Sequence, residues 1–476
     1  MAERHRFDRS ILREYDVRGI VGETLSEKDA YYLGKGYVTI VMRRGVPQPT
    51  ICVGYDGRLS SPALEAALVD GAMSAGAEVV RVGCGPTPML YFAVHHLSVD
   101  GGIMVTGSHN PPSHNGFKIM IGRQSFYGRD IVELGQMVEI GDLTTGRGSE
   151  RDYDLLAAYV DRLTCDLADV DISRLSVGWD AGNGAAGEAM THVTARIGGR
   201  HVLLNEMIDG TFPAHHPDPT QPENLRQLQD YVIRDKLDLG IAFDGDGDRI
   251  GVIDGRGRII WGDQLLAILA RDVLAERPGS TIIADVKASQ VVFDEIERRG
   301  GRALMWKTGH SLIKSKMIEV SSPLAGEMSG HIFFADHYYG YDDALYAAVR
   351  LLKVVARHGG NLATLRDQLP SMVNTPELRF DCPEERKFKI VADVSDRLAR
   401  QGARFDVTDG VRVTTSDGWW LLRASNTQAV LVARAEAKDD AGLSRLVDAL
   451  QAQLRESGWR STAEVPSARE LSHEWQ

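Results

Sequence analysis

One pattern of strand, helix and strand is written three times in this chain. The first copy is TICVGYDGR, with a strand expected to end at Asp56, then the helical ALEAALVDGAMSAGA and the strand EVVRVG. The second runs through LSVGWDAGN, ending at Asp180, and the third through TIIADVKAS, ending at Asp285. In each, a β-branched run precedes a polar turn and a segment with 3.6-residue apolar spacing. The repetition predicts three related α/β domains built from βαβ units.

The C-terminal part of the chain follows a different pattern. A helix is expected near EERKFKIVADVSDRLARQG, followed by the strand-like runs VRVTTS, GWWLLRAS and AVLVARAEA and a closing helix, AGLSRLVDALQAQL. Consecutive strands with short turns predict an antiparallel sheet and hence a smaller α+β domain. We expect domains at residues 1–152, 153–256, 257–370 and 371–476.

Composition narrows the class of partner. The net charge of −12, without any lysine- or arginine-rich run, argues against nucleic acid as the main partner. No apolar run approaches the length of a membrane span, and the charged MAERHRFDRS differs from a signal peptide, so we expect a cytoplasmic protein without membrane contact. The four cysteines lie far apart without CxxC spacing, as is typical of reduced thiols.

The stretch VTGSHNPPSHNGFK, residues 105–118, has neither helical nor strand periodicity and is expected to form a loop. It carries a serine, two histidines and a lysine.

A second segment, FDGDGDR, alternates Asp244, Asp246 and Asp248 with glycines between the strand-like LGIAF and IGVID. Three carboxylates so close together repel one another unless a hard divalent cation neutralises them, so this loop predicts a magnesium site. An EF-hand is excluded, because Arg249 and Gly255 occupy its glycine and glutamate positions and strands flank the loop. A solvated acidic turn is the alternative.

The turn GNGAAG, residues 182–187, raises a hypothesis of another class. It fits the dinucleotide pattern G-x-G-x-x-G after a strand, with Glu206 further along, and would serve an NAD-dependent dehydrogenase. A tight turn in a packed domain explains the same glycines, and the aspartate loop has no role in a dehydrogenase. The neighbouring His215 and His216 lie among prolines and are expected in an ordered loop.

Two further segments are rich in polar groups. GEMSGH, residues 326–331, offers a carboxylate, a hydroxyl and an imidazole, which suit vicinal sugar hydroxyls. RASNT, residues 423–427, offers a guanidinium and hydroxyls suited to a phosphate. Either segment alone could equally be a polar turn.

Taken in order, TGSHNPP, DGDGDR, GEMSGH and RASNT resemble the α-D-phosphohexomutase superfamily, and within it the phosphomannomutase/phosphoglucomutase branch. EYDVRG at residues 14–19, DGTFPAHHPDPTQPENL from Asp209 and KTGHSLIK from Lys307 extend the resemblance over nearly the whole chain. It implies four domains around one central cleft. The implied reaction interconverts hexose 1-phosphate and hexose 6-phosphate through a phosphoserine and a hexose 1,6-bisphosphate.

The resemblance also implies roles for individual residues. Ser108 would carry the transferred phosphate and, with Asp244, Asp246 and Asp248, ligate magnesium. Glu327 and Ser329 would hold the sugar hydroxyls. The non-reacting phosphate would bind Arg423, Ser425, Asn426 and Thr427. The same cleft would be lined by Tyr15, Arg18, His109, Lys118, Arg249, Lys287, Thr308, Gly309 and His310.

Proton transfer at the sugar hydroxyl needs a group that titrates, for which His331 and Lys118 are the candidates, with Arg18 in support. Glucose 1,6-bisphosphate is the expected activator. TGSHNPP with GEMSGH favours mannose and glucose phosphates, and a phosphoglucosamine mutase is the alternative. Ser113 and His114, together with the tail STAEVPSARELSHEWQ, depart from the pattern without disturbing these motifs.

Overall fold

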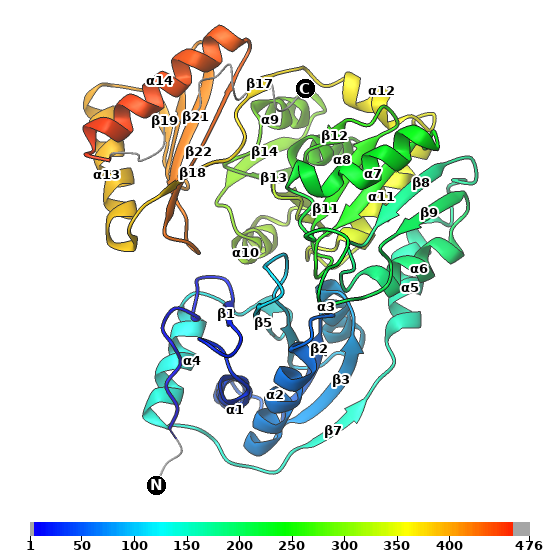
Figure 1. Cartoon of the computed structure of the whole chain (residues 1–476), viewed down its shortest axis with the longest axis vertical. Coiled ribbons are helices and arrows are strands. Elements are labelled where there is room, and N and C mark those ends of the chain that lie inside the picture. Colours follow the sequence, from blue (N-terminus) through cyan, green and yellow to red (C-terminus); the bar gives the residue numbers. More distant parts are fainter. Residues whose placement is uncertain (1–3, 460–476) are drawn as a thin grey trace.

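The computed structural model describes residues 4–459, so the tail STAEVPSARELSHEWQ lies outside the described residues. Four sheets form along the chain (Figure 1). Their strand orders are β1-β5-β4-β2-β3-β7, β12-β11-β10-β8-β9, β14-β13-β15-β16 and β17-β22-β21-β20-β19. We number the domains one to four after these sheets.

The three predicted βαβ units are confirmed. They are β2 (Thr50–Tyr55), α2 (Ser61–Ala75) and β3 (Glu78–Cys84); β8 (Ser176–Asp180), α6 (Gly187–Arg196) and β9 (Arg200–Leu204); and β13 (Thr281–Asp285), α9 (Gln290–Arg298) and β14 (Arg302–Trp306). The two strands of each unit pair in parallel, as a helical crossover requires. The first strand of each unit ends at or directly before Asp56, Asp180 or Asp285.

A hairpin completes each unit in the same way. These hairpins are β4 (Gly101–Val105) with β5 (His114–Ile121), β10 (Leu239–Phe243) with β11 (Ile250–Asp254), and β15 (Leu324–Gly326) with β16 (Ile332–Phe334). The first strand of each hairpin lies parallel to the first strand of its unit. The loop at residues 106–113, called the serine loop, the loop at residues 244–249, called the aspartate loop, and the GEMSGH loop each join the two strands of a hairpin. They therefore occupy equivalent places in the three domains.

Residues 114–118 correct one expectation. We expected loop throughout 105–118, but His114–Lys118 begin β5, which pairs with both β4 and β1 (Val17–Ile20). A strand buried on both faces shows no alternation of polar and apolar residues, so its periodicity is not visible in the sequence. The extended backbone carries Lys118 into the interior.

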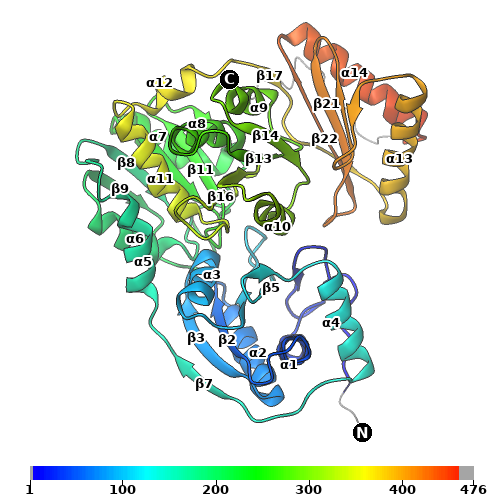
Figure 2. The ribbon, with the colours of Figure 1, turned by 180° about the vertical axis from the view of Figure 1, so that it is seen from behind.

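The fourth domain is an antiparallel sheet backed by two helices, as predicted. It comprises β17 (Val373–Asn374), β18 (Leu378–Asp381), α13 (Glu384–Arg400), β19 (Phe405–Asp406), β20 (Val411–Thr414), β21 (Gly418–Ala424), β22 (Val430–Ala437) and α14 (Asp440–Glu456). Its core is a separate apolar cluster around Trp420 and Leu450. From either side, this domain lies beside β13 and β14 (Figures 1 and 2).

The remaining elements cover the sheets or link the domains. They are α1 (Glu27–Arg43), α3 (Thr87–His96), β6 (Gln124–Ser125), α4 (Arg129–Ile140), β7 (Ser149–Asp152), α5 (Leu156–Thr164), a 3-10 turn at Cys165–Leu167, α7 (Pro222–Arg234), β12 (Ile259–Ile260), α8 (Gly262–Glu276), α10 (His310–Val320), α11 (Ala344–Arg357) and α12 (Leu362–Asp367). Among residues 4–459, no helix has the length and apolarity needed to cross a bilayer. All four cysteines are free.

Candidate active site

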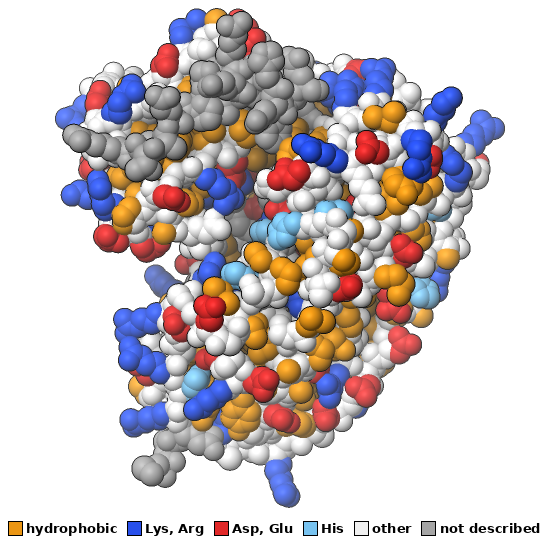
Figure 3. Space-filling view, in the orientation of Figure 1, with side chains coloured by type: hydrophobic (Ala, Val, Ile, Leu, Met, Phe, Trp, Pro, Cys, Tyr) orange, Lys and Arg blue, Asp and Glu red, His pale blue; other side chains and the backbone are white. Residues whose placement is uncertain are grey.

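Loops from all four domains meet around one cavity of about 420 Å³. The space-filling view shows the surface hollowed between the fourth domain and the rest of the molecule, with charged and histidine side chains around the hollow (Figure 3). Most of the residues singled out in the sequence line this cavity: Tyr15, Arg18, Ser108, His109, Lys118, Arg249, Lys287, Thr308, Gly309, His310, Glu327, Ser329, His331, Arg423, Ser425 and Thr427.

Asp244, Asp246 and Asp248 lie beneath the cavity, and each is fully buried. One carboxylate oxygen from each falls within 4.8 Å of the others. The Oδ1 atoms of Asp246 and Asp248 are buried without a hydrogen-bond partner, although buried polar atoms are nearly always paired. Converging carboxylates with unpaired oxygens suit a hard divalent cation, so the donor set fits magnesium.

Lys118 lies among these carboxylates. Its Nζ is 2.7 Å from Asp246 Oδ2 and also bonds to Asp248. Burial alone would lower the pKa of Lys118, but Asp246 and Asp248 outweigh burial and raise that pKa. Burial and the two neighbouring carboxylates raise the pKa of Asp244 well above its usual range. The lysine is therefore a fixed cation at the floor of the site.

Ser108 sits at the edge of the aspartate loop. Its Oγ lies 3.1 Å from Nδ1 of His109 and 3.2 Å from Oδ2 of Asp244. The backbone of Ser108 is left-handed, with φ of 51°, which is uncommon for a residue other than glycine. Burial, with the nearby Arg249, holds the pKa of His109 well below its usual range, so the imidazole beside the serine is neutral.

The GEMSGH loop is organised by the third domain. Oε1 of Glu327 accepts a hydrogen bond from the backbone N–H of Gly309, and Oε2 lies 3.4 Å from the hydroxyl of Ser329. Asp285, at the end of β13, accepts from the hydroxyl of Thr308 and from the N–H of Met328. These bonds fix the carboxylate of Glu327 at the cavity wall.

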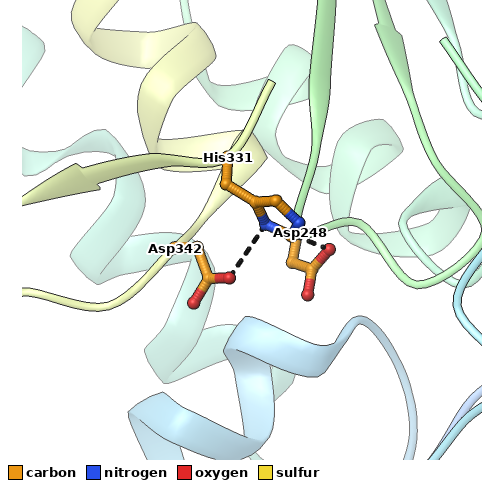
Figure 4. A group of neighbouring side chains, drawn as sticks. All are labelled: Asp248, His331 and Asp342. Atoms are coloured by element: carbon orange, nitrogen blue, oxygen red, sulfur yellow. Dashed lines mark ion pairs between the residues drawn. The ribbon is translucent and has the colours of Figure 1, made fainter. Parts of the chain in front are cut away.

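His331 lies in a chain of charged partners (Figure 4). Its Nδ1 is 2.9 Å from Oδ2 of Asp342 and 3.6 Å from Oδ1 of Asp248, and its Nε2 accepts from Nε of Arg249 at 2.9 Å. Lys314 reaches the other oxygen of Asp342 at 2.9 Å. Burial would raise the pKa of Asp342, but Lys314 and His331 hold it well below its usual range. A charged aspartate therefore orients the imidazole.

The RASNT segment, residues 423–427, is called the phosphate loop after its expected ligand; it begins in the last two residues of β21 and continues into the turn before β22. Nε of Arg423 donates to Oδ2 of Asp409 at 3.0 Å, and that same oxygen accepts from the N–H of Thr308. Asp409 thus joins the fourth domain to the third and orients the guanidinium. Asn426 does not line the cavity, because its side-chain amide instead donates to the hydroxyl of Tyr15.

The GNGAAG turn has a structural use. The N–H of Ala185 donates to the carbonyl of Gly245 in the aspartate loop, and the N–H of Gly182 donates to Asp180. A Cβ at residue 184 would lie 2.9 Å from that same carbonyl. The glycines permit close packing against the aspartate loop, which favours the tight packed turn over the alternative of a dinucleotide site. His215 binds Asp180 at 2.9 Å, within the ordered loop expected for it.

Sequence reasoning missed several residues of the site. Asp342 and Asp409 orient His331 and Arg423, and Glu377 holds Nζ of Lys287 at 2.9 Å. Asp16 binds Arg18, and Arg58 contacts the serine loop. The only available signal was indirect: Asp16 lies inside EYDVRG and Arg58 follows the first strand aspartate, whereas Asp342, Asp409 and Glu377 lie outside every motif.

The sequence matches four family descriptions in chain order. These are phosphoglucomutase/phosphomannomutase alpha/beta/alpha domain I at residues 9–133, domain II at 157–257, domain III at 261–373, and the phosphoglucomutase/phosphomannomutase C-terminal domain at 377–453.

Curated relatives agree over almost the whole chain. Phosphomannomutase/phosphoglucomutase of Pseudomonas putida is 44% identical over 447 residues, covering 94% of this chain and 95% of the relative. Phosphomannomutase/phosphoglucomutase of Pseudomonas aeruginosa is 42% identical over 447 residues, covering 94% of this chain and 96% of the relative. Phosphoglucomutase of Neisseria gonorrhoeae is 39% identical over 451 residues, covering 94% and 97%.

The fold agrees as well. A phosphoglucomutase/phosphomannomutase family protein from Burkholderia thailandensis superposes with a TM-score of 0.89 at 40% identity, covering 96% of this chain and 99% of that protein. Sequence, domain order and fold together show that this chain belongs to the phosphoglucomutase/phosphomannomutase family of the α-D-phosphohexomutases.

Proposed function

We propose that this phosphohexomutase moves a phosphoryl group between the 1- and 6-positions of mannose and glucose phosphates through a phosphoserine at Ser108. One observation carries the proposal. The Oγ of Ser108 lies 3.2 Å from Asp244, at the edge of three converging buried carboxylates and facing the cavity. A phosphoester at that oxygen would be placed between the cation-binding carboxylates and a bound sugar.

Asp244, Asp246 and Asp248, together with the phosphate on Ser108, would hold the magnesium. A bound divalent cation neutralises charge on the transferring phosphoryl group. Lys118, the side chain that bonds to Asp246 and Asp248, would add a positive charge from the protein itself that helps to neutralise the phosphoryl group. Its raised pKa supports a cationic role in place of a role as base.

His331 is the better supported candidate for proton transfer. In the forward direction the sugar hydroxyl oxygen attacks phosphorus and the bond from phosphorus to Ser108 Oγ breaks. The hydroxyl proton passes to His331, and Oγ takes up one proton to restore the serine hydroxyl. Asp342 faces Nδ1, so Nε2 would take the proton, and it can do so only when the bound sugar displaces the hydrogen bond that Nε2 accepts from Nε of Arg249 in this structure. Arg18, held by Asp16 at 2.5 Å, would stabilise negative charge on the oxygens of the transferring phosphoryl group.

The non-reacting phosphate would bind Arg423, Ser425 and Thr427 at the opposite wall, with Asn426 acting through Tyr15. Glu327 and Ser329 would hold the hydroxyls of the ring between the two ends. The hexose 1,6-bisphosphate must then turn round, so that the second phosphate returns to Ser108. One phosphate site therefore accepts either end of the sugar, and glucose 1,6-bisphosphate would act as activator by recharging the serine.

The test of the proposal is the phosphate itself. Intact mass spectra of the purified protein should show a fraction heavier by one phosphoryl group that maps to Ser108. Phosphatase treatment should abolish turnover, and glucose 1,6-bisphosphate should restore it. Ser108→Ala should fold and bind substrate but lose nearly all turnover. Full activity in Ser108→Ala without any phosphorylated residue would refute the mechanism.

The preferred sugar is tested separately by comparing turnover of glucose, mannose and glucosamine 1-phosphates. The names of the relatives at 39–44% identity favour the first two sugars. Preference for the amino sugar would move the protein to the phosphoglucosamine branch.

A further inference from the structure

Arg58 follows β2 and is one of the most deeply buried charged residues of the protein, with 1% of its surface exposed. Its guanidinium makes five hydrogen bonds, which is the number of its N–H groups. Nε donates to Oδ2 of Asp56 at 3.2 Å. The four Nη bonds go to backbone carbonyls in or directly after the serine loop: Ser108 (2.7 Å), Asn110 (2.6 Å), Pro111 (2.6 Å) and His114 (3.0 Å).

The guanidinium is also enclosed on its faces. A Cβ at Gly107 would lie 2.5 Å from Cζ and from Nε of Arg58, so a glycine is needed directly before Ser108. Phe212 of the second domain lies over the guanidinium, with 5.2 Å between Cζ and the ring centroid. This contact gives a structural use to Phe212 of the DGTFPAHHPDP segment. Arg58 is thus held between the serine loop and the neighbouring domain.

The conformation of the serine loop requires such support. Ser108 has φ of 51°, a left-handed backbone that is unfavourable for a residue other than glycine. The carbonyl of Ser108 bonds to Arg58, and a Cβ at Gly245 in the aspartate loop would lie 2.4 Å from that same carbonyl. The peptide group that follows Ser108 is therefore fixed between Arg58 and the aspartate loop.

We propose that Arg58 is a positioning residue for phosphoryl transfer, which sets the left-handed conformation of Ser108 and so the place of its Oγ beside Asp244. This inference rests on the proposed role of Ser108. Arg58 is not among the residues that line the cavity. A lysine would keep the charge, but it has only three donors and no planar fork, so it cannot hold four carbonyls at once.

The test compares Arg58→Lys with Arg350→Lys. Arg350 is a matched control, since it is also buried and binds Asp336 through both Nη atoms, but in the third domain away from the cavity. Two rates are measured for each folded variant: steady-state turnover of glucose 1-phosphate, and single-turnover phosphorylation of the dephosphorylated enzyme by glucose 1,6-bisphosphate, followed by intact mass.

In Arg58→Lys, both rates should fall together by about 100-fold, the effect of a misplacement of about 1 Å at the reacting atom. KM should stay within about threefold, because the phosphate loop at Arg423 is untouched. Arg350→Lys should keep both rates. A folded Arg58→Lys enzyme with wild-type rates would overturn the inference.

If Arg58→Lys does not fold, the inference is tested by measuring the same two rates in Gly107→Ala. Its Cβ displaces the guanidinium without removing it, so the same joint loss of both rates is expected, and unchanged rates would overturn the inference. A wild-type enzyme that accepts no phosphate from glucose 1,6-bisphosphate would instead refute the proposed role of Ser108, and the inference would fall with it.

Discussion

The hydroxyl of Tyr15 and the side-chain amide of Asn426 lie 2.6 Å apart, although 411 residues separate them in the chain. The same hydroxyl donates to the carbonyl of Thr308 at 3.0 Å. Arg13 adds a third link, from its Nη1 to the carbonyl of Thr427. Three domains are thus joined at the cavity by the loop before β1, and the phosphate loop is held in place by a residue from the opposite end of the sequence.

Tyr15→Phe should weaken substrate binding by removing both hydrogen bonds of the hydroxyl. Each is worth about 0.5–1.5 kcal/mol, so kcat/KM should fall about tenfold while kcat changes little. Steady-state kinetics with glucose 1-phosphate and mannose 1-phosphate measure this. Tyr127→Phe is the matched control, because Tyr127 also links the first domain to the third, through Ser315, but does not line the cavity. Equal kinetics in both variants would contradict the prediction.

Asp246→Asn should reduce turnover by about 100-fold or more, since a cation that is worth several kcal/mol to the transition state loses one carboxylate. Magnesium binding measured by calorimetry should weaken in parallel, while circular dichroism stays unchanged. Asp230→Asn, at an exposed aspartate of α7 in the same domain, should behave as wild type. Wild-type turnover of Asp246→Asn at limiting magnesium would remove the metal assignment.

Arg423→Ala should raise KM for glucose 1-phosphate and mannose 1-phosphate alike. A lost charge-assisted contact is worth roughly 1.5–3 kcal/mol, which corresponds to about a tenfold to hundredfold loss of kcat/KM. Arg445→Ala, which removes an exposed arginine paired with Asp417 in the same domain, is the control. If kcat/KM is unchanged with both sugars, the phosphate binds elsewhere.

Asp343 should make stability depend on pH. Burial raises its pKa to about 6, and the N–H of Tyr346 and the hydroxyls of Tyr338 and Tyr159 lower it only in part. A raised carboxyl pKa means that the folded state holds its proton more tightly than the unfolded state does. The stability from this group is therefore complete below its ordinary pKa of 3.8 and is lost as the pH rises through about 6.

The measurement is urea unfolding of wild type and Asp343→Asn at about pH 5 and about pH 7.5. The asparagine of the variant has no carboxyl proton to lose, so only wild type loses stability as the pH rises. The free energy of unfolding of the variant minus that of wild type should therefore rise by on the order of 1 kcal/mol between the two pH values. Asp417→Asn is the control, because Arg445 lowers the pKa of that half-buried carboxyl and its titration lies below the interval. If the difference in the free energy of unfolding between Asp343→Asn and wild type is the same at both pH values, the pKa of Asp343 is not raised.

The sequence by itself determined the elements whose signal is local. The βαβ units whose first strands lead into Asp56, Asp180 and Asp285 and the antiparallel C-terminal sheet were predictable, because side-chain period and turn residues act over a few neighbours. The aspartate loop was equally visible as a candidate cation site, since three alternating carboxylates repel one another, but only the structure shows that all three are buried. The strand at His114–Lys118 was not visible, because it is buried on both faces and gains its conformation from β1 and β4.

Only the tertiary structure decided which residues meet. Nothing in the spacing of residues links Tyr15 to Asn426, Asp342 to His331 or Arg58 to the carbonyls around Ser108, because these pairs form when whole domains pack. The glycines of GNGAAG show the same limit, since their pattern fits a nucleotide turn and only the approach of Gly245 reveals their packing role. Local patterns determine backbone conformation, whereas the orientation of a catalytic group depends on partners that folding brings from distant parts of the chain.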